Sequence, residues 1–213
     1  DIIMDNGGLV DKYIGDAIMA FWGAPLANTH QAHDAARAAI QMESALKVLG
    51  DNWEKRGLPR ISIGVGINSG EVIVGNMGST RRFNYTIMGD EVNFASRLEG
   101  LNKMYGTSCI ISEGTYRAMQ DSANGNGLPE GIYVRHRDTV TVKGKNVPKK
   151  IYELISLENK NENEKTEIIN RCAKFANART AYEKGNWEDA IAMFNEILLS
   201  TNDGPSHALL ERV

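Results

Sequence analysis

The stretch Leu9–Pro25, which reads LVDKYIGDAIMAFWGAP, contains two charged residues that could do chemistry. Asp16 follows Gly15 between two apolar-rich runs, and this pattern predicts a two-residue hairpin turn with Asp16 at its tip. A carboxylate at such a tip is exposed enough to hold a cation. Lys12 shares a strand face with the apolar residues two positions away, because side chains alternate along a strand. A lysine there either extends to solvent or has a partner elsewhere in the chain.

A second stretch, Tyr85–Gly100, reads YTIMGDEVNFASRLEG and predicts a short strand followed by a helix. Asn93 and Arg97 are four residues apart, so they project from one polar face of that helix. The opposite, core-facing stripe consists of Phe94, Leu98 and Leu101. Taken alone, an asparagine and an arginine on a polar helix face are ordinary solvated residues.

Together the two stretches resemble the class III nucleotidyl cyclase catalytic domain, specifically its adenylyl cyclase branch. The resemblance covers residues 1–156 in four ordered blocks: KYIGDAIMAFWG (12–23), GINSGEVIVGNMG (66–78), RRFNYTIMGDEVNFASRLEG (81–100) and VKGK (142–145). It implies a mixed α/β (α+β) fold, a ferredoxin-like sandwich in which helices pack on a sheet.

The resemblance implies that the parent protein is an adenylate cyclase. Such an enzyme converts ATP to 3′,5′-cyclic AMP and pyrophosphate by in-line attack of the ribose 3′-oxygen on the α-phosphorus. Arg97 would stabilise the transition state, and Asn93 would orient the ribose. Arg81 and Lys143 would bind phosphate oxygens. Asp16 would hold one of the two Mg²⁺ or Mn²⁺ ions of a complete site.

Base selection, in this resemblance, depends on Lys12 and Thr86. Adenine presents an acceptor at N1 and a donor at its 6-amino group. Lys12 can only donate, and the Thr86 hydroxyl can accept. Guanine reverses the pattern, so Lys12 opposes a guanylyl cyclase. The threonine is similar to that of the branch containing the bicarbonate-responsive enzymes, which implies bicarbonate as a regulator. The alternative is a threonine that is simply a strand residue.

The resemblance also implies a homodimer. In the family, the metal-binding aspartates and the base-binding residues of one chain serve different active sites at a head-to-tail interface. The family's other metal-binding aspartate lies on an earlier strand, and no residue of this chain matches it. We therefore expect an N-terminally incomplete domain, inactive on its own, within a protein that has an upstream sensor domain. A catalytically silent cyclase-homology module that dimerises and senses a ligand is the alternative.

The elements between these residues can be predicted from local pattern. An amphipathic helix is expected from a cap at Asn28-Thr29 to about Leu49. Ile61–Ile67 and Glu71–Val74 are expected to form a hairpin, because both runs are rich in β-branched residues. Gly75–Arg82 is expected to be a flexible surface loop. Further strands are expected at Ser108–Ser112, Tyr133–Val142 and Lys149–Ile155.

The last part of the chain differs in composition. Residues 157–166 (LENKNENEKT) read as a polar linker. Residues 167–213 are expected to form a helical hairpin with helices at Glu167–Glu183 and Trp187–Leu199. This hairpin resembles one tetratricopeptide repeat in the residues Tyr182, Gly185, Trp187, Ala190 and Phe194. Because a single repeat cannot bury its own face, the hairpin should pack on the catalytic domain, its dimer mate or another partner.

Composition limits the remaining possibilities. The 213 residues suffice for one α/β domain and a small appendage. The net charge of −3 and the lack of a basic run argue against a nucleic-acid partner. The two cysteines fit no metal spacing and suggest a reducing, cytoplasmic location. No apolar run approaches ~20 residues, so we expect no membrane contact by this segment.

Overall fold

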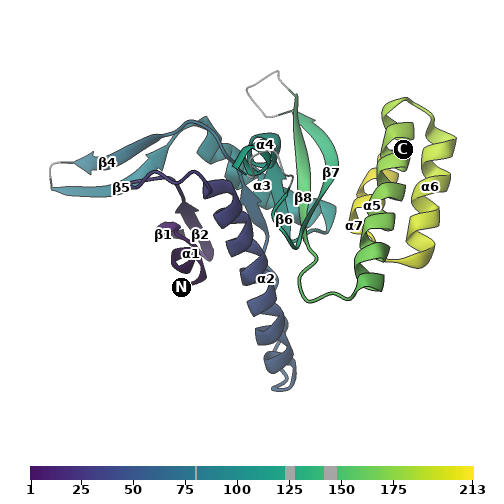
Figure 1. Cartoon of the computed structure of the whole chain (residues 1–213), viewed down its shortest axis with the longest axis horizontal. Helices are drawn as coiled ribbons and strands as arrows, with labels where there is room; N and C mark the ends of the chain where they lie inside the picture. The colour runs from purple at the N-terminus through teal and green to yellow at the C-terminus, as the bar shows by residue number, and fades with distance from the viewer. Residues whose placement is uncertain (80, 123–127, 142–147) are drawn as a thin grey trace.

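A four-stranded sheet lies at the centre of the computed structural model, which describes all of the 213 residues except 80, 123–127 and 142–147 (Figure 1). Its strands, in spatial order, are β3 (Val65–Ile67), β6 (Cys109–Ser112), β8 (Pro148–Ser156) and β7 (Ile132–Thr141). The β3–β6 pair is parallel, and the other two pairs are antiparallel. With helices on both faces, this sheet confirms the predicted mixed α/β fold class.

The helices that cover the sheet are α2 (Gln31–Glu54), α3 (Asp90–Tyr105) and α4 (Glu113–Ser122). Strand β6 is buried along its whole length because its side chains alternate between two cores. Cys109 and Ile111 pack with α2 and α4 on one face. Ile110 packs with α3 on the other face. Helix α3 therefore lies on the opposite face of the sheet from α2 and α4.

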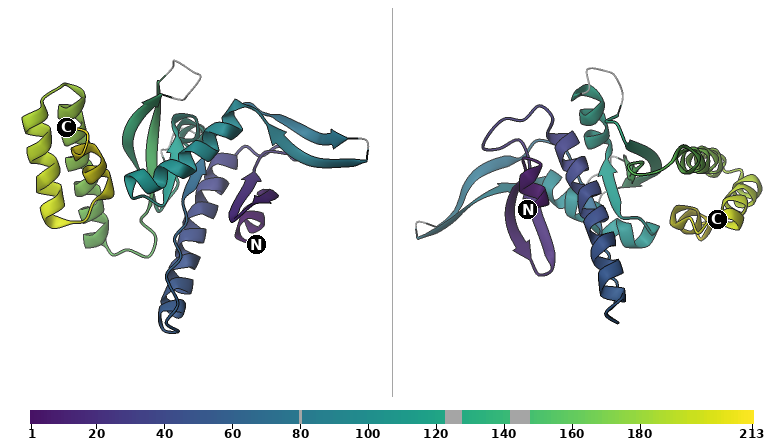
Figure 2. Two further views of the ribbon diagram at one scale, coloured as in Figure 1. Left: turned by 180° about the vertical axis from the view of Figure 1, so that it is seen from behind. Right: turned by 60° about the horizontal axis from the view of Figure 1, so that its bottom comes forward.

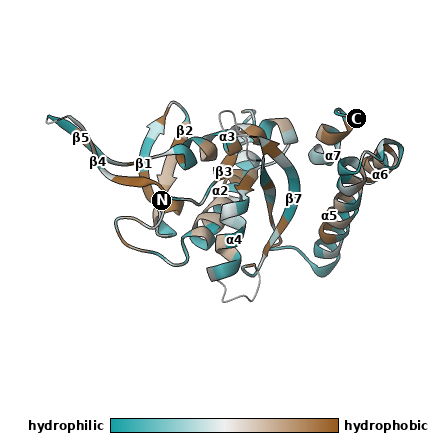
Figure 3. Ribbon diagram, turned by 90° about the horizontal axis from the view of Figure 1, so that it is seen from above, coloured by the Kyte–Doolittle hydropathy of each residue, from teal (hydrophilic) through white to brown (hydrophobic). Residues whose placement is uncertain are grey.

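Two β-hairpins lie beside the central sheet. The first joins β1 (Leu9–Ile14) to β2 (Ala17–Phe21) after a short helix, α1 (Ile2–Asp5). The second joins β4 (Ile73–Ser79) to β5 (Arg82–Met88). The β4–β5 hairpin extends away from the sheet on the side opposite the C-terminal helices (Figures 1 and 2). Its tip is hydrophilic, as its teal colour shows (Figure 3).

Two predictions in this region are wrong. Ile61–Ile67 and Glu71–Val74 do not form a hairpin, because β3 pairs in parallel with β6 instead. Gly75–Ser79 and Arg82 are strand and not loop residues, since the antiparallel β4–β5 ladder runs from Ile73↔Met88 to Ser79↔Arg82. The glycines that predicted a loop here lie instead in a projecting hairpin, where few side chains need to pack.

Helix boundaries also differ from the predictions. α2 begins after His30 and continues to Glu54, beyond the predicted end at Leu49. The predicted linker 157–166 is helical from its sixth residue, because Asn161 and Glu164 form a capping box at the start of α5. Three C-terminal helices are present in place of the predicted two: α5 (Glu162–Glu183), α6 (Trp187–Ser200) and α7 (Gly204–Leu210). The tetratricopeptide resemblance stays a prediction.

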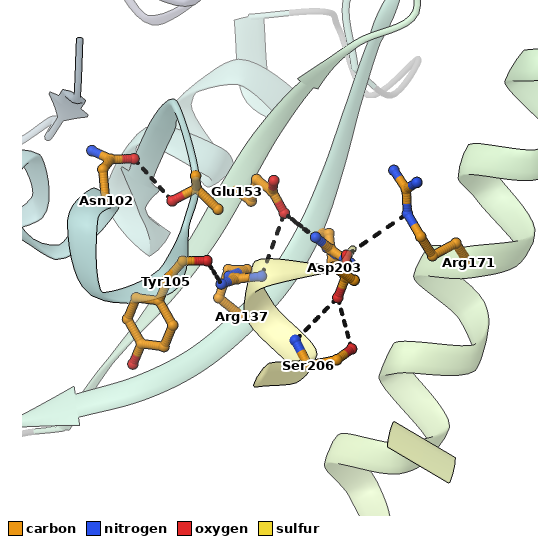
Figure 4. Close-up of polar contacts among 9 residues, drawn as sticks. Asn102, Tyr105, Arg137, Glu153, Arg171, Asp203 and Ser206 are labelled. Atoms are coloured by element: carbon orange, nitrogen blue, oxygen red, sulfur yellow. Dashed lines mark hydrogen bonds and ion pairs between the residues drawn. The ribbon is translucent and has the colours of Figure 1, made fainter. Parts of the chain in front are cut away.

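The C-terminal helices contact the central sheet through buried charges (Figure 4). Arg135 of β7 donates to Asp203, which precedes α7, at 2.8 Å, and to Glu153 of β8 at 2.6 Å. The side chains of Arg135 and Asp203 are each 3% exposed. Arg212 donates to the Tyr105 hydroxyl at the end of α3 at 3.0 Å. The C-terminal helices therefore hold both β7 and α3. Within the described ranges, none of the helices has the length and apolar character needed to span a bilayer.

Candidate active site

The first hairpin carries Asp16 at its tip, as the sequence predicts. Ile14 pairs with Ala17, which leaves Gly15 and Asp16 as the two-residue turn. Gly15 has φ +65°, a conformation that favours glycine. Asp16 is exposed, so its carboxylate is accessible to a cation. Its role as a metal ligand stays a prediction.

A β-bulge at Asp11 changes the direction of the side chains in β1. The register against β2 shifts between Val10 and Lys12, and Asp11 is the extra residue. A bulge interrupts the alternation of side chains along a strand. As a result, two consecutive residues, Asp11 and Lys12, both contact Thr86 of β5. The simple alternation expected along this strand is therefore wrong between Val10 and Lys12.

Lys12 and Thr86 lie in different hairpins and meet directly. Lys12 Nζ donates to Thr86 Oγ1 at 3.0 Å, and the Thr86 hydroxyl donates to the Asp11 carboxylate. Lys12 Nζ also lies 3.3 Å from Asp11 Oδ1. The Lys12 side chain keeps 39% of its surface exposed, whereas that of Asp11 has none. An aromatic contact between Phe21 of β2 and Tyr85 of β5, with ring centroids 6.2 Å apart, also joins the two hairpins.

The second predicted stretch forms β5 and α3. Gly89, with φ +152°, turns the chain from the strand into the helix. Asn93 and Arg97 are both exposed on α3. On the opposite face of α3, Phe94 and Leu98 are 3% and 0% exposed and attach the helix to the core. The packing thus presents Asn93 and Arg97 from a rigid helix.

A polar cluster holds the start of α3 against β8. Glu91 accepts a hydrogen bond from Asn68 at 2.8 Å and pairs with Lys149 at 2.9 Å. The Lys149 ammonium also lies 4.6 Å from the centre of the Phe94 ring. Lys149 lies near the start of β8, so this cluster holds the first turn of α3 against that strand.

Of the two predicted phosphate-binding residues, the structure describes Arg81 but not Lys143. Arg81 lies in the turn between β4 and β5 and is exposed. Lys143 lies outside the described residues. Neither role is tested by the geometry, and both stay predictions.

The described residues do not by themselves make a complete metal site. Among them, no group of three or more His, Cys, Asp or Glu side chains could hold a metal ion. The Asp16 carboxylate is an oxygen donor of the kind that Mg²⁺ and Mn²⁺ prefer. It supplies one ligand, and a two-ion site would need ligands in addition to those described.

Asp11 is the residue that sequence reasoning missed. Its carboxylate is buried and contacts both members of the Lys12–Thr86 pair. Strand alternation assigned Asp11 to the opposite face from Lys12, and the bulge that reverses this has no glycine to mark it. The one signal available was an aspartate inside an otherwise apolar strand, next to a lysine.

The fold is that of known nucleotidyl cyclases. The adenylyl cyclase CyaB from P. aeruginosa superposes with a TM-score of 0.62 at 34% identity, over 74% of this chain and 76% of that one. The guanylyl cyclase Cya2 superposes with a TM-score of 0.62 at 30% identity, over 76% of each chain. Both base specificities therefore occur on this fold.

The chain belongs to the adenylate and guanylate cyclase catalytic domain family, whose model matches residues 6–156. It is 43% identical over 157 residues to an adenylate cyclase from Anabaena cylindrica, over 71% of this chain and 29% of the relative. The chain thus spans less than a third of the length of that relative.

Proposed function

We propose that this chain is the catalytic domain of an adenylate cyclase, which converts ATP to 3′,5′-cyclic AMP and pyrophosphate. The observation that carries the proposal is the contact between Lys12 and Thr86 at 3.0 Å. A donor beside a hydroxyl matches the N1 acceptor and the 6-amino donor on the edge of adenine. Guanine has a proton on N1 that would face the Lys12 ammonium. The identity to an adenylate cyclase supports the same substrate.

Catalysis in this proposal rests on positioning and electrostatics. Arg97 stabilises the negative charge that develops on the α-phosphate, and Asn93, one helical turn earlier, orients the ribose. Arg81 and Lys143 bind the remaining phosphate oxygens. The packing of Phe94 in the core supports this assignment, because it holds the catalytic face of α3 in place.

The family resemblance adds two divalent cations, Mg²⁺ or Mn²⁺, to each complete site. When bound, such ions activate the ribose 3′-oxygen and stabilise the pyrophosphate leaving group. Asp16 is the described residue that would hold one of them.

The active form in this proposal is a head-to-tail homodimer with shared sites. The support is an exposed apolar surface on the two hairpins that carry the proposed site. Tyr13 and Ile14 of β1 are 73% and 59% exposed, and Ile73 and Phe83 of the second hairpin are 71% and 63% exposed. Soluble monomers rarely expose contiguous apolar patches, and such patches often mark interfaces.

Regulation and location follow from the resemblance as further proposals. Bicarbonate would regulate the enzyme, because Thr86 is similar to the threonine of the bicarbonate-responsive branch. Comparing sodium bicarbonate with sodium chloride at one pH would test this directly. A sensor domain elsewhere in the protein would supply other signals. A cytoplasmic location agrees with the burial of both free cysteines, Cys109 and Cys172.

The test uses the purified full-length protein, with ATP or GTP as substrate and Mg²⁺ or Mn²⁺ as the metal. Chromatographic detection of the cyclic products should show cyclic AMP formed faster than cyclic GMP, and Arg97→Ala should abolish both. Preferential formation of cyclic GMP would contradict the assigned base. Nucleotide binding without any cyclic product would instead favour a catalytically silent module.

A further inference from the structure

A buried carboxylate, that of Asp11, lies beside the proposed base-binding pair and has no role in the proposed reaction. Its side chain is fully buried. One oxygen accepts the hydroxyl proton of Thr86. The other, Oδ1, lies 3.3 Å from Lys12 Nζ and has no hydrogen-bond partner. Burial of a carboxylate costs free energy, so a position like this calls for a physical explanation.

The contact with Asp11 changes what the Thr86 hydroxyl can do. A free hydroxyl has one proton to donate and two lone pairs to accept with, so it can bind either an amino or a carbonyl group. In this structure its proton points to Asp11, and one lone pair accepts from Lys12. Only acceptor capacity is left for a third partner. Thr86 held in this way suits the 6-amino group of adenine and opposes the 6-oxo group of guanine.

The shape of the fold does not distinguish adenine from guanine. The adenylyl cyclase CyaB and the guanylyl cyclase Cya2 superpose on this chain with the same TM-score, 0.62. Selection between the two purines must therefore come from individual side chains. A threonine selects poorly unless its proton is held, and the bulge in β1 brings Asp11 to the position that holds it.

We propose that Asp11 is a positioning residue that holds the Thr86 hydroxyl as a hydrogen-bond acceptor and thereby selects a 6-aminopurine nucleotide over a 6-oxopurine nucleotide. This inference rests on the proposed function, because it names what makes the same site specific. Asp11 acts through Thr86 and Lys12 and does not touch the nucleotide.

Asp11→Asn is the most informative variant, because it keeps the shape of the side chain. The amide oxygen is expected to face the Lys12 ammonium, which needs an acceptor. The amide nitrogen then donates to Thr86 and releases the hydroxyl proton, so the hydroxyl can donate to a base. Asp51→Asn, at an exposed aspartate of α2 that pairs with Arg60, is the matched control. If Asp11→Asn does not fold, Asp11→Ser replaces it. A serine hydroxyl can both donate and accept, so it does not fix the direction of the Thr86 proton.

The probe is purine riboside triphosphate, which keeps the N1 acceptor of ATP but lacks the 6-amino group. The ratio of its kcat/KM to that of ATP reports on the Thr86 contact alone. One neutral hydrogen bond should give the wild-type full-length protein a preference for ATP of about tenfold. We expect this preference to fall to about onefold in the Asp11 variant and to stay unchanged in Asp51→Asn. Discrimination against GTP should fall with it.

The rescue experiment separates positioning from general damage. Thr86→Asp introduced into Asp11→Asn supplies an acceptor that needs no orientation, so the preference for ATP should return. An unchanged preference in the single Asp11 variant, or no recovery in the double variant, would overturn the inference. Dissociation constants for the same nucleotides, measured by calorimetry, give the same ratio without turnover. A protein that makes no cyclic AMP but loses its ATP preference on Asp11→Asn would contradict the proposed function and support the role of Asp11.

Discussion

The ammonium group of Lys12 lies between the Thr86 hydroxyl and the buried carboxylate of Asp11, at 3.0 and 3.3 Å. An ammonium has three protons to donate, and its one hydrogen bond here is to Thr86, so a proton is left for N1 of a bound adenine. Lys12 is therefore expected to contribute both to base binding and to the stability of the hairpin junction. Replacing it should affect two separate measurements.

Lys12→Met removes the donor but retains a side chain of similar length. Loss of the N1 contact should reduce kcat/KM for ATP by about ten- to a hundredfold. The Asp11 carboxylate loses its cationic neighbour while it stays buried, so the free energy of unfolding should fall by about 1–3 kcal/mol. Steady-state kinetics and thermal melting of the full-length protein check both effects. Unchanged ATP kinetics would mean that Lys12 does not bind the base.

For single residues, the sequence predicts the hydrogen-bonding character of a side chain better than the strand face to which that side chain points. The donor and acceptor character of Lys12 and Thr86 can be read from their types alone. The position of Asp11 cannot, because a bulge depends on how β1 and β2 align across the hairpin and on what packs against them. Strand alternation is a local rule, and it fails at the one residue where the register shifts.

Helix α3, which carries Asn93 and Arg97, is held to the sheet by a close backbone contact at Gly66 of β3. A Cβ atom at Gly66 would lie 2.3 Å from both the Ala95 carbonyl oxygen and the Glu99 amide nitrogen. Such distances are shorter than any van der Waals contact, and neither partner is a flexible side chain. The glycine therefore sets how closely Asn93 and Arg97 approach the rest of the molecule.

Gly66→Ala should push α3 away from the sheet. We expect a loss of about 1–3 kcal/mol in the free energy of unfolding, typical of overpacking in a core. Cyclase activity should fall by up to about a hundredfold, because small displacements of catalytic groups are costly. Gly100→Ala, in the same helix with nothing within 4 Å, should instead stabilise by about 0.5–1 kcal/mol. Equal melting temperatures for the two variants would contradict the close-contact argument.

Elements set by local pattern were predicted more successfully than elements set by distant partners. The turn at Gly15 and the helix carrying Asn93 follow from turn chemistry and periodicity. Strand β3 was assigned to the wrong partner because its true partner, β6, is about 40 residues away in sequence. Helix α7 was missed although Asp203 and Pro205 form a recognisable helix start.

The junction between the C-terminal helices and the sheet should depend on pH through Asp203. Burial alone would raise the pKa of Asp203, but Arg135 and the hydrogen bonds from Ser206 outweigh burial and lower that pKa. The folded carboxyl therefore binds a proton less readily than the unfolded one. Its contribution to stability is complete above the unfolded pKa, about 4, and is lost as the pH falls through the lower, folded pKa.

Asp203→Asn tests this contribution. At pH 7 the variant should lose about 2–3 kcal/mol in the free energy of unfolding, since a buried charged hydrogen bond is removed. The difference from wild type should shrink as the pH is lowered from 7 to 3 in urea-unfolding experiments. Glu196→Gln, in an exposed ion pair with Lys174, should lose at most about 1 kcal/mol at any pH. A difference for Asp203→Asn that is the same at both pH values would contradict the assigned linkage.

The whole molecule carries its exposed apolar hairpins and its C-terminal helices on different sides (Figures 1 and 2). The side with the hairpins carries Asp16, Lys12 and Arg81, and all three lie on β1–β2 or β4–β5. A second copy packed against these hairpins would bury the apolar side chains and bring two sets of these residues together. Dimer assembly and site assembly would then be one event, and the C-terminal helices would stay outside the interface.

Mixing two inactive variants tests this arrangement of shared sites. Asp16→Ala and Arg97→Ala homodimers should each be nearly inactive, because every site lacks either its metal ligand or its transition-state arginine. In a heterodimer one site combines the intact Asp16 of one chain with the intact Arg97 of the other, and the second site carries both lesions. Random pairing makes about half of the dimers heterodimers, each with one good site of two, so about a quarter of wild-type activity should return. Co-expression of the two full-length variants with different affinity tags allows the heterodimer to form during synthesis and to be isolated. Cyclic AMP production by that heterodimer no higher than that of either parent would place Asp16 and Arg97 in one site of a single chain.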